Sequence, residues 1–586
     1  MSKKKDYENW NREDLIKEID ALRKQKTYGL VWERDSTKEC FDYYLNWDGS
    51  NTKEQFTDSQ NKLPVLKEVK ENNILTDLSL PNNILIEGDN YHSLAVLNFT
   101  HRMAIDVIYI DPPYNTGHND FKYNDKWVEI EDGYRHSKWL SFMEKRLKLC
   151  LNLLKKQGII FISIDDNEVA QLKLLCDEIF NEANHIAILP TVINLKGNND
   201  QFGFAGTHEY VLVYAKSRKH AHVGEFLVDD EGFEDWEQDD YGYFKKGANL
   251  KSTGVNAPRH KRRNLFYPIF ITDEDQVYVT NDDKIPLARR GMNDTTLLPI
   301  TGNQEMTWRW EKKKVASEPY NIIVSRTGSS VSIYKKQRPK LGDLPTKKPK
   351  TLFYKPEYSS GNGTAQIKRL FGSKIFNNPK PLDLIKDLLL ISSDKDSVIL
   401  DFFAGSGTTG HAVLDLNDTD GGKRKFILCT NNEENICTDV CYPRIAKVIS
   451  GYSVDNSEIQ PLRSNLKYFK TDFVESAPTD MNKKTIVEKS TEMLCVKEDA
   501  YVKVAEGSGF KIFKNSKVNV GIIFDMDAID EFIDVALGVD GYFHTYVFSL
   551  DSSVPETEFD HLKDRVQLCP IPEAILNVYR RIFKEK

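Results

Sequence analysis

A glycine-rich turn directly after an apolar run is the first feature whose residue types could do chemistry. Residues 398–411 read VILDFFAGSGTTGH, in which Gly405, Gly407 and Gly410 have the spacing G-x-G-x-x-G. Such glycines let the backbone approach a ligand closely, and the N–H groups that begin a following helix can bind it. Glu433 follows the next predicted strand, where it could accept hydrogen bonds from a ribose. These features predict a nucleotide-type ligand, with a dinucleotide or a purely structural turn as alternatives.

Two residues at the start of this turn narrow the chemistry of the ligand. Asp401 ends the predicted strand and Phe402 follows it, which gives the sequence D-F-F-A-G-S-G-T-T. A carboxylate would repel a pyrophosphate but attract a ligand with a cationic centre. S-adenosylmethionine is a nucleoside with a sulfonium and an ammonium group, so the turn favours it over a dinucleotide.

A second candidate site lies where another apolar run ends. Residues 107–117 read VIYIDPPYNTG, and two consecutive prolines after a buried strand force a rigid loop beyond its carboxyl end. Open α/β sheets bind ligands at that edge. Asp111 and the carbonyl groups of Pro112 and Pro113 form a cluster of hydrogen-bond acceptors beside the ring of Tyr114. The cluster could hold the exocyclic amine of a flat base while the ring stacks on it, which predicts a base-modifying site.

Strands and helices alternate around both features. Continuous apolar runs predict buried parallel strands at 84–86, 107–110, 159–165, 398–401 and 425–428. Helical spacing predicts helices at 91–99, 139–156, 169–180, 382–391 and from 408 on. Gly158 is expected to end the second of these helices. The alternation breaks near residue 190 and returns near 382, which predicts one sheet domain with a large insertion.

The inserted segment is basic although the whole chain is acidic. The net charge is −8, whereas residues 241–350 hold 22 Lys and Arg against 10 Asp and Glu, a net charge of +12. A basic block of this kind is the electrostatic footprint that a polyanion needs, and a solvated loop region is the alternative. The expected phosphate contacts are Arg259, Lys261, Arg262, Arg263, Arg289, Arg290, Lys335, Lys336, Arg338 and Lys340. Interleaved aromatic residues could stack on bases or pack in a core: Phe266, Tyr267, Trp308 and Trp310.

Composition limits the class of protein and its compartment. A chain of 586 residues suggests about two to four domains, and 40% hydrophobic with 29% charged residues is typical of a folded globular protein. No apolar run approaches the length of a membrane span, and the first residues lack the apolar segment of a secretory signal. Eight scattered cysteines are typical of a reducing cytoplasm, and they lack the spacing of a metal site. We therefore expect a cytoplasmic protein without a bound metal.

Both motifs resemble those of a known enzyme family. Residues 401–409 resemble motif I of the DNA amino-methyltransferases, and the motif order, with the basic insertion in between, is similar to their β class. The more specific likeness is to the modification (Mod) subunits of type III restriction–modification systems. The stretches that carry it are KTYGLVWE, NNILIEGDNYHSL, GIIFISIDDNE, THEYVLVYAK, TWRWEKKK, IFNNPKPLDLI, ILDFFAGSGTTGHAV and GGKRKFILCTNNE.

The resemblance implies a role for each motif residue. Asp111, Pro112, Pro113 and Tyr114 would hold and stack an adenine flipped out of DNA. The site of S-adenosylmethionine would be lined by Asp401, Phe402, Gly405 and Gly407, with Glu433 at the ribose, Asp89 and Asn90 near the adenine, and Lys380 near the methionine carboxylate. For Lys380, an exposed place at a helix start is the alternative. The family usually has Gln-Leu-Pro before the glutamate, where this chain departs with Thr430-Asn431-Asn432.

The resemblance also implies a substrate and partners. Asp at the start of the second motif resembles adenine-N6 enzymes, whereas Ser there would resemble cytosine-N4 enzymes. A site-specific DNA adenine methyltransferase is therefore expected, with a cytosine-N4 methyltransferase, a nicotinamide-dependent oxidoreductase and a non-catalytic binding subunit as alternatives. Double-stranded DNA would be the substrate. The chain would form a homodimer and could pair with a helicase–nuclease (Res) subunit, to which ATP and Mg²⁺ would belong.

The predicted fold class is α/β, a Rossmann-like doubly wound methyltransferase sheet interrupted by a target-recognition insertion. A small helical region at 1–75, with an amphipathic helix over 11–25, and an α/β domain at 456–586 are expected as additions. The two parts of the methyltransferase domain are expected at 76–188 and 356–455. The insertion is expected at 189–355.

Overall fold

The structure is a computed structural model of the chain. It describes Trp32 and residues 62–584, except 119, 124–125, 198–202, 229–232, 281–292, 329, 340–343, 455–456, 476–478, 550–553, 555 and 563. The helix predicted over residues 11–25 lies outside the described residues. The chain forms two compact units: a first one that ends at Gly224 and resumes at Lys350, and a second one, Glu225–Pro349.

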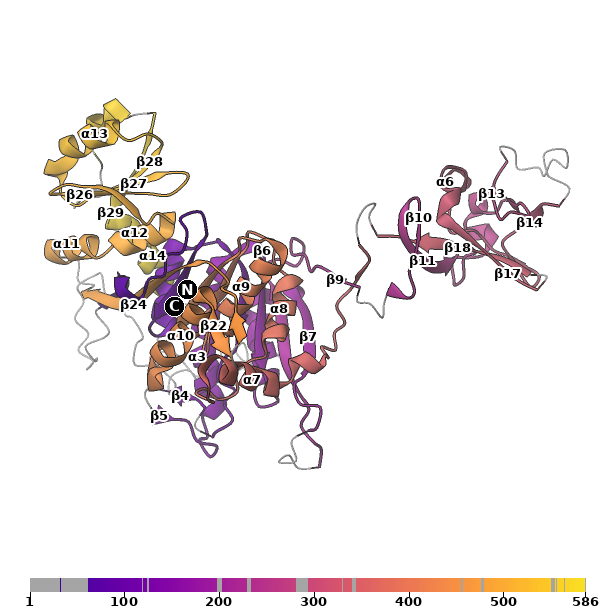
Figure 1. The fold of residues 1–586 in the computed structure, drawn as a ribbon, viewed down its shortest axis with the longest axis horizontal. Coiled ribbons are helices and arrows are strands. Elements are labelled where there is room, and N and C mark those ends of the chain that lie inside the picture. The colour runs from indigo at the N-terminus through magenta and orange to yellow at the C-terminus, as the bar shows by residue number, and fades with distance from the viewer. Residues whose placement is uncertain are drawn as a thin grey trace, which may run out of the picture. The chain divides into compact units, whose positions relative to one another are not determined.

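A nine-stranded sheet is the centre of the first unit (Figure 1). In spatial order the strands are β1 (Lys62–Glu68), β24 (Asn465–Glu475), β2 (Asn82–Glu87), β21 (Lys425–Thr430), β20 (Val398–Asp401), β3 (Ile105–Ile110), β6 (Leu154–Ile164), β8 (His208–Ala215) and β7 (His185–Val192). Four of the inner strands, β2, β21, β3 and β6, contain continuous buried runs, as expected for strands covered on both faces. The six strands from β24 to β6 are parallel, and β1 and β8 run the opposite way.

The chain leaves two neighbouring strands in opposite directions. From β3 it proceeds to β6 on one side, whereas from β20 it proceeds to β21 on the other. Crossover connections are right-handed, so the two sets of helices cover opposite faces of the sheet. The helices α2 (Asn90–Thr100), α3 (Arg135–Leu153) and α4 (Val169–Cys176) pack together on one face, and α8 (Leu382–Leu390), α9 (Thr408–Asp420) and α10 (Tyr442–Ser450) on the other. The boundary between β3 and β20 is the switch point at which such sheets bind ligands.

The predicted doubly wound α/β fold is confirmed, with one local difference. The helix predicted over residues 139–156 is α3, but it ends at Leu153 rather than before Gly158. Strand β6 begins at Leu154 because that residue already pairs with Ile105 of β3. Sheet pairing therefore ends the helix earlier than the glycine would. No helix within the described ranges is long and apolar enough to cross a membrane.

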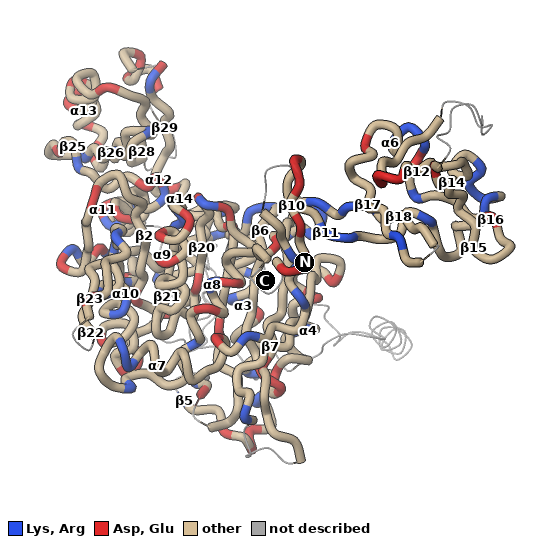
Figure 2. Tube along the Cα trace, turned by 45° about the vertical axis from the view of Figure 1, so that its right-hand side comes forward, with Lys and Arg blue, Asp and Glu red and all other residues tan. Residues whose placement is uncertain are grey.

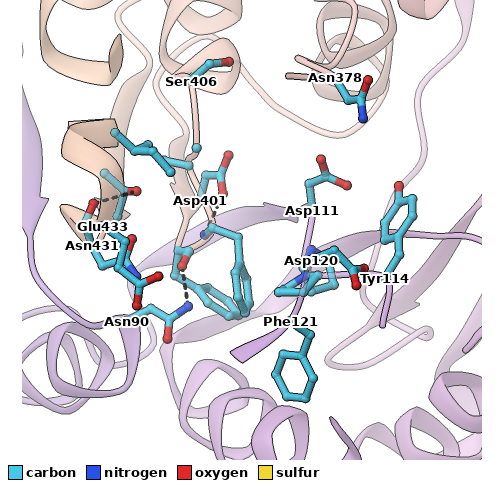
Figure 3. A pocket seen from close by; sticks show the side chains of 18 of the residues that line it. Asn90, Asp111, Tyr114, Asp120, Phe121, Asn378, Asp401, Ser406, Asn431 and Glu433 are labelled. Carbon is cyan, nitrogen blue, oxygen red and sulfur yellow. Dashed lines mark hydrogen bonds between the residues drawn. The ribbon is translucent and has the colours of Figure 1, made fainter. Parts of the chain in front are cut away.

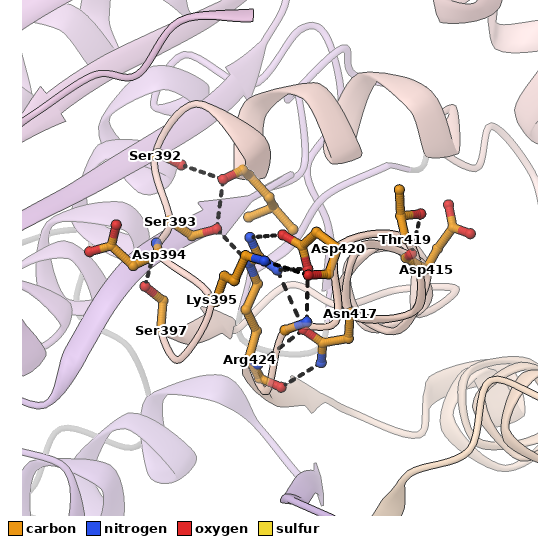
Figure 4. Close-up of polar contacts among 12 residues, drawn as sticks. Ser392, Ser393, Asp394, Lys395, Ser397, Asp415, Asn417, Thr419, Asp420 and Arg424 are labelled. Carbon is orange, nitrogen blue, oxygen red and sulfur yellow. Dashed lines mark hydrogen bonds and ion pairs between the residues drawn. The ribbon is translucent and has the colours of Figure 1, made fainter. Parts of the chain in front are cut away.

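A polar network fixes the amino-terminal edge of the sheet (Figure 4). The guanidinium group of Arg424, just before β21, forms an ion pair with Asp420 at 2.8 Å and donates a hydrogen bond to Ser393 Oγ at 3.0 Å. Its backbone N–H donates to Asn417 Oδ1 of α9. The network ties the end of α9 and the loop after α8 together, which fixes the two connections that flank β20.

The tail of the chain forms a second sheet but belongs to the first compact unit. Five strands lie in the order β25 (Val502–Glu506), β26 (Phe510–Lys514), β27 (Asn519–Ile523), β28 (Phe543–Phe548) and β29 (Val566–Ile571), with helices α11 (Asp480–Glu488), α12 (Thr491–Glu498), α13 (Ile529–Leu537) and α14 (Glu573–Lys584). Helices α12 and α14 pack on α2, and the Tyr579 hydroxyl donates to the Pro64 carbonyl at 2.5 Å. The boundary predicted at 455 precedes β24, which lies within the central sheet.

The second unit consists of antiparallel strands. One sheet has the order β10 (Glu237–Asp239), β11 (Gly242–Asn249), β18 (Ser330–Gln337) and β17 (Ile322–Thr327), and a smaller one has β13 (Val277–Tyr278), β12 (Ile269–Ile271) and β14 (Thr295–Leu297). Short pairs are β9 (Phe226–Leu227) with β19 (Thr346–Lys347), and β15 (Ile300–Thr301) with β16 (Gln304–Glu305), and one helix is α6 (Lys312–Ser317). The unit is narrower than the predicted insertion 189–355, because β7 and β8 belong to the central sheet.

The first unit also has short elements near the site and on its surface. These are the strand pairs β4 (Lys122–Tyr123) with β5 (Lys126–Trp127) and β22 (Tyr452–Val454) with β23 (Ser457–Ile459), and the helix α7 (Ser360–Phe371). Strands β4 and β5 lie in the segment between β3 and α3, and Lys122 and Trp127 from these strands line the cavity described below.

Candidate active site

Both motifs open into one cavity at the carboxyl edge of the central sheet. Asp111 follows β3 and Asp401 ends β20, and these two strands pair directly although 290 residues separate the aspartates. The cavity measures about 750 Å³ and is lined from the ends of β2, β21, β20 and β3. Figure 3 shows the carboxylates of Asp111 and Asp401 near its middle. The fold therefore brings the two predicted sites together as one.

Asp401 is a buried carboxylate without a cation at hydrogen-bond distance among the described residues. Its side chain is 2% exposed and accepts hydrogen bonds from the Phe403 N–H at 3.0 Å and from Thr409 Oγ1 at 2.5 Å. Burial raises the pKa of Asp401 to about 7, although the two hydrogen bonds act in the opposite direction. A carboxylate in this state gains most from a ligand that brings positive charge.

The glycine-rich turn needs its glycines for two physical reasons. Gly405 and Gly407 have φ angles of +49° and +78°, which residues with a Cβ rarely adopt. Gly407 is also the residue that precedes α9, and a Cβ there would lie 3.1 Å from Cys441 Sγ. The turn and the first residues of α9 thus line the cavity. Phe402, which directly follows Asp401, is fully buried and lines the cavity.

Asp89 and Asn90, after β2, are held by a buried arginine. Arg146 of α3 is 1% exposed, donates to Asn90 Oδ1 at 2.6 Å and forms an ion pair with Asp89 at 3.4 Å. Asn90 in turn donates to the carbonyl oxygen of Phe402 at 2.9 Å. Asp89 also caps α2 by accepting from the Tyr91 N–H at 2.7 Å. The end of β2 is thereby joined to the glycine-rich turn.

The Asp-Pro-Pro-Tyr loop is fixed by a hydrogen bond to its backbone. Trp139, which is fully buried in α3, donates from Nε1 to the Pro113 carbonyl oxygen at 2.7 Å. This carbonyl is therefore already an acceptor for a protein group, which differs from the predicted open cluster of two prolyl carbonyls. The next residue, Asn115, has a φ of +58° and donates to the buried Glu168 at 2.5 Å. Asp111 and the Pro112 carbonyl are left as the acceptors expected for a ligand.

Lys380 lies at the Asp-Pro-Pro-Tyr loop rather than exposed at a helix start. Its side chain is 13% exposed, and Nζ lies 3.2 Å from Asp111 Oδ1 and 2.9 Å from Glu209 Oε1. It also donates to the Tyr114 hydroxyl at 2.6 Å. That hydroxyl donates to Glu209 Oε2 at 3.0 Å, so all four side chains form one cluster.

The loop that carries Lys380 depends on a close backbone approach. Gly363 of α7 packs against the Asn-Pro-Lys-Pro segment, and a Cβ at this position would lie 2.1 Å from the Pro379 carbonyl oxygen. Gly363→Ala must therefore move the backbone next to Lys380, and we expect a loss of about 1–3 kcal/mol of unfolding free energy. Denaturant unfolding followed by circular dichroism measures this change.

Gly361→Ala in the same helix is the matched control. Among the residues that the structure describes, the one atom within 4 Å of a Cβ at that position is Ser359 Oγ at 3.6 Å, an ordinary contact. This variant should keep the wild-type stability or gain slightly from the better helix propensity of alanine. Equal stability of the two variants would show that the close approach at Gly363 is not needed.

Glu433 lies at the rim of the cavity. Its side chain is 49% exposed and forms an ion pair with Lys122 at 3.0 Å. The preceding Thr430 and Asn431 also line the cavity, so the departure from the family sequence leaves the glutamate at the cavity. Glu434 and Asn435 follow with φ angles of +51° and +59°.

Lys and Arg residues recur along the second unit (Figure 2). By their exposure and ion pairs, the predicted DNA contacts fall into two groups. Lys261, Arg262 and Arg263 are exposed, and Arg259 is exposed but forms an ion pair with Glu305 at 2.9 Å. Lys336 and Arg338 instead pair with Asp239 at 2.6 and 2.5 Å, with side chains only 15% and 13% exposed, and Lys335 is half-buried beside them. Arg338 is foremost in holding the pKa of the Asp239 carboxyl well below its usual range. Arg289, Arg290 and Lys340 lie outside the described residues.

Two of the four aromatic candidates are core residues. Tyr267 and Trp308 are 3% and 2% exposed in the core of the second unit, and Trp308 Nε1 donates to the Tyr267 carbonyl at 2.7 Å. Stacking on a base is thus the wrong role for them, because their faces are covered by apolar neighbours. Phe266 and Trp310 are partly exposed.

Two functional candidates were missed by the sequence reasoning. Arg146 occupies the apolar face of α3, with Met143 and Leu147, and a charge on such a face was a readable signal. Glu209 is the second residue of β8 and is 4% exposed. Because β8 runs against β6, its beginning lies at the same edge as the end of β3.

Comparisons with known proteins show the family of the chain. The family model described as DNA methylase matches residues 105–439 and thus includes both motifs, and the chain belongs to this DNA methylase family. The chain is 46% identical over 397 residues to the EcoPI Mod subunit of a type III restriction–modification enzyme from Escherichia phage P1, a match that covers 64% of this chain and 61% of the relative.

Two other relatives extend the comparison. The type II methyltransferase M.KpnI of Klebsiella pneumoniae is 34% identical over 408 residues, which cover 68% of this chain and 92% of the relative. The StyLTI Mod subunit of Salmonella typhimurium is 33% identical, over 61% of this chain and 54% of the relative. The chain thus matches somewhat more than half of the length of these Mod subunits.

Proposed function

We propose that the protein is a site-specific DNA methyltransferase that transfers a methyl group from S-adenosylmethionine to adenine N6 in duplex DNA. The observation that carries this proposal is the shared cavity, which joins the glycine-rich turn at Asp401 to the Asp-Pro-Pro-Tyr loop at Asp111. A methyl donor and a base need such adjoining places, since the reacting atoms must be held about 3–3.5 Å apart. A nicotinamide-dependent oxidoreductase would leave the second motif without a use.

The residues around the turn fit S-adenosylmethionine. Asp401 is a carboxylate whose pKa is raised to about 7 by burial, and a sulfonium or ammonium group would supply the positive charge that favours its ionised form. Gly405 and Gly407 allow close contact with the methionine part, while Asp89, Asn90 and Phe402 would line the adenine. Glu433, at the rim, would accept hydrogen bonds from the ribose hydroxyls. When bound, S-adenosylmethionine supplies an electrophilic methyl group.

The Asp-Pro-Pro-Tyr loop would act on the adenine. Asp111 and the Pro112 carbonyl would accept hydrogen bonds from the N6 amine and stabilise the positive charge that builds on N6 as the methyl carbon leaves sulfur and bonds to nitrogen. The methylated amine would then release one proton to solvent. Tyr114 stacks on the ring of the base. A base inside a duplex cannot reach this loop, so it must flip out at a cost of about a few kcal/mol, which stacking offsets in part.

The second unit would hold the DNA. Its exposed basic residues, Lys261, Arg262 and Arg263, suit phosphate contacts, which position a duplex without reading its sequence. Lys336 and Arg338 suit this role less well, because Asp239 already pairs with both. Association of the chain into a homodimer and pairing with a helicase–nuclease (Res) subunit are part of the same proposal, supported by the relatives named as Mod subunits. The scattered cysteines support a cytoplasmic setting.

Identification of the modified base tests the proposal. The purified chain is incubated with labelled S-adenosylmethionine and bacterial genomic DNA that lacks adenine methylation, and the DNA is digested to nucleosides for chromatography. We expect the label in N6-methyladenine. Label in N4-methylcytosine would show that the methyl acceptor is cytosine instead of adenine. The name of the matching family model, N6_N4_Mtase, covers both acceptors. Absence of transfer to DNA would contradict the proposal.

A further inference from the structure

Four side chains from three distant segments form a cluster at the Asp-Pro-Pro-Tyr loop. Asp111 and Tyr114 follow β3, Glu209 is the second residue of β8, and Lys380 precedes α8. Lys380 Nζ lies within 3.2 Å of a carboxylate oxygen of both Asp111 and Glu209 and 4.8 Å from the centre of the Tyr114 ring. Glu209 accepts hydrogen bonds from both Lys380 and the Tyr114 hydroxyl, each at 3.0 Å.

The charges in the cluster do not cancel. Two carboxylates share one ammonium group in a place where the lysine is 13% and the glutamate 5% exposed. Burial by itself would lower the pKa of Lys380, but Asp111 and Glu209 outweigh it and raise the pKa, so the lysine is charged. Burial raises the pKa of Glu209, while Lys380 opposes this. The lysine therefore allows two carboxylates to lie together in an enclosed site.

We infer that Lys380, anchored by Glu209, positions the methyl-acceptor side of the site rather than the methionine carboxylate. This inference rests on the proposed function. Lys380 holds the Asp111 carboxylate in place as an acceptor, and Glu209 fixes Lys380 on one side and the Tyr114 hydroxyl on the other. The Tyr114 hydroxyl is thereby held by Glu209 and Lys380, and Trp139 holds the preceding Pro113 carbonyl, which together orient the ring for stacking on a base.

The contacts of Lys380 explain why the methionine carboxylate is the poorer choice. Asp111, Glu209 and Tyr114 already place four oxygen atoms within 3.2 Å of the ammonium group, which has three donors. A carboxylate ligand would have to displace one of them and leave a buried acidic group without its cation. Such a loss is costly in an enclosed site.

Replacement of the two anchoring residues tests the inference. For Lys380→Met, Glu209→Gln and the double variant, single-turnover methyl transfer is measured at saturating DNA and S-adenosylmethionine, and calorimetry gives the affinity and stoichiometry for S-adenosylmethionine. We expect the rate to fall about 30-fold for Lys380→Met and about tenfold for Glu209→Gln, with the dissociation constant changed less than threefold. Lys386→Met is the matched control, because Lys386 pairs with Asp415 outside the cavity and should keep the wild-type rate.

The double variant distinguishes positioning from independent effects. Lys380→Met leaves Asp111 and Glu209 facing each other without a cation, and Glu209→Gln removes that repulsion. The double variant should therefore be no slower than Lys380→Met, whereas a fall of about 300-fold, the product of the single effects, would overturn the shared role. A stoichiometry near one for each variant shows that folding is intact, and Glu209→Gln carries the test if Lys380→Met does not fold.

Two other outcomes would overturn the inference in different ways. If Lys380→Met weakens S-adenosylmethionine binding more than tenfold and keeps the rate at saturation, the lysine belongs to the cofactor and only this inference fails. If the wild-type chain transfers no methyl group to DNA, the proposed function itself fails and the inference falls with it.

Discussion

Asp111→Asn should lower the single-turnover rate of methyl transfer about a thousandfold. The amide has nearly the same volume, but it presents an N–H donor to an amine that is itself a donor, and it carries no charge to stabilise the cation forming on N6. Removal of one well-placed electrostatic group in an enclosed site costs about 10²–10³ in rate. Rapid-quench measurement with labelled S-adenosylmethionine and DNA in excess gives this rate.

Binding measurements on the same variant separate chemistry from folding. Asp111 contacts Lys380 and directly follows β3, so it is not part of the glycine-rich turn that is expected to hold the cofactor. The dissociation constant for S-adenosylmethionine should therefore change less than about threefold. Asp166→Asn, at an exposed hydrogen bond to Tyr210, is a control that should keep the wild-type rate. A rate for Asp111→Asn within tenfold of the wild type would contradict the role of Asp111.

Asp401→Asn should weaken S-adenosylmethionine binding about 100-fold. The substitution keeps an acceptor for the Phe403 N–H but removes the buried charge that a sulfonium or ammonium group would meet. A charge-assisted hydrogen bond in a buried place contributes about 1.5–3 kcal/mol, which corresponds to roughly 10- to 150-fold in affinity. Calorimetric titration measures the change. Asp418→Asn, exposed on the same helix α9, is the control, and equal affinities for the two variants would contradict the account.

The same carboxyl group predicts a pH dependence of binding. The pKa of Asp401 is raised to about 7 by burial, so below pH 7 the group is increasingly protonated and must release its proton when a cation binds. Affinity should thus be level above pH 7 and fall about tenfold for each pH unit below it. The Asp401→Asn variant should lack this slope, because its amide does not titrate. A wild-type affinity that does not change between pH 6 and pH 8 would show that Asp401 does not face the cation.

The motifs were predictable because their chemistry is local. The strand at 398–401 and the helix from 408 appear at the expected residues, and both loops lie at carboxyl strand ends as two prolines and a glycine-rich turn require. The pairing of β3 with β20 also follows from the motif order once the sheet is known to be doubly wound. Local sequence patterns therefore define the two halves of the site and the edge at which they lie.

Glu209 was not predictable, because its role depends on strand direction. The run that forms β8 indicates a strand but not that it runs against its neighbour, and only this direction brings Glu209 beside Tyr114. The ion pairs of Lys336 and Arg338 with Asp239 were not predictable for a similar reason. They depend on the strand order of the second unit, in which β11 lies between β10 and β18. Basic residues counted along the chain thus include some whose charge the fold has already neutralised.

The most direct test of the central claim is a map of modified bases on genomic DNA. The wild-type chain and Asp111→Asn are each incubated with S-adenosylmethionine and DNA free of adenine methylation, and single-molecule sequencing locates the modified positions. N6-methyladenine at one defined sequence with the wild-type chain, and none above background with the variant, is the predicted result. An unmodified map with the wild-type chain, or equal modification with both, would contradict the claim that this cavity methylates adenine in DNA.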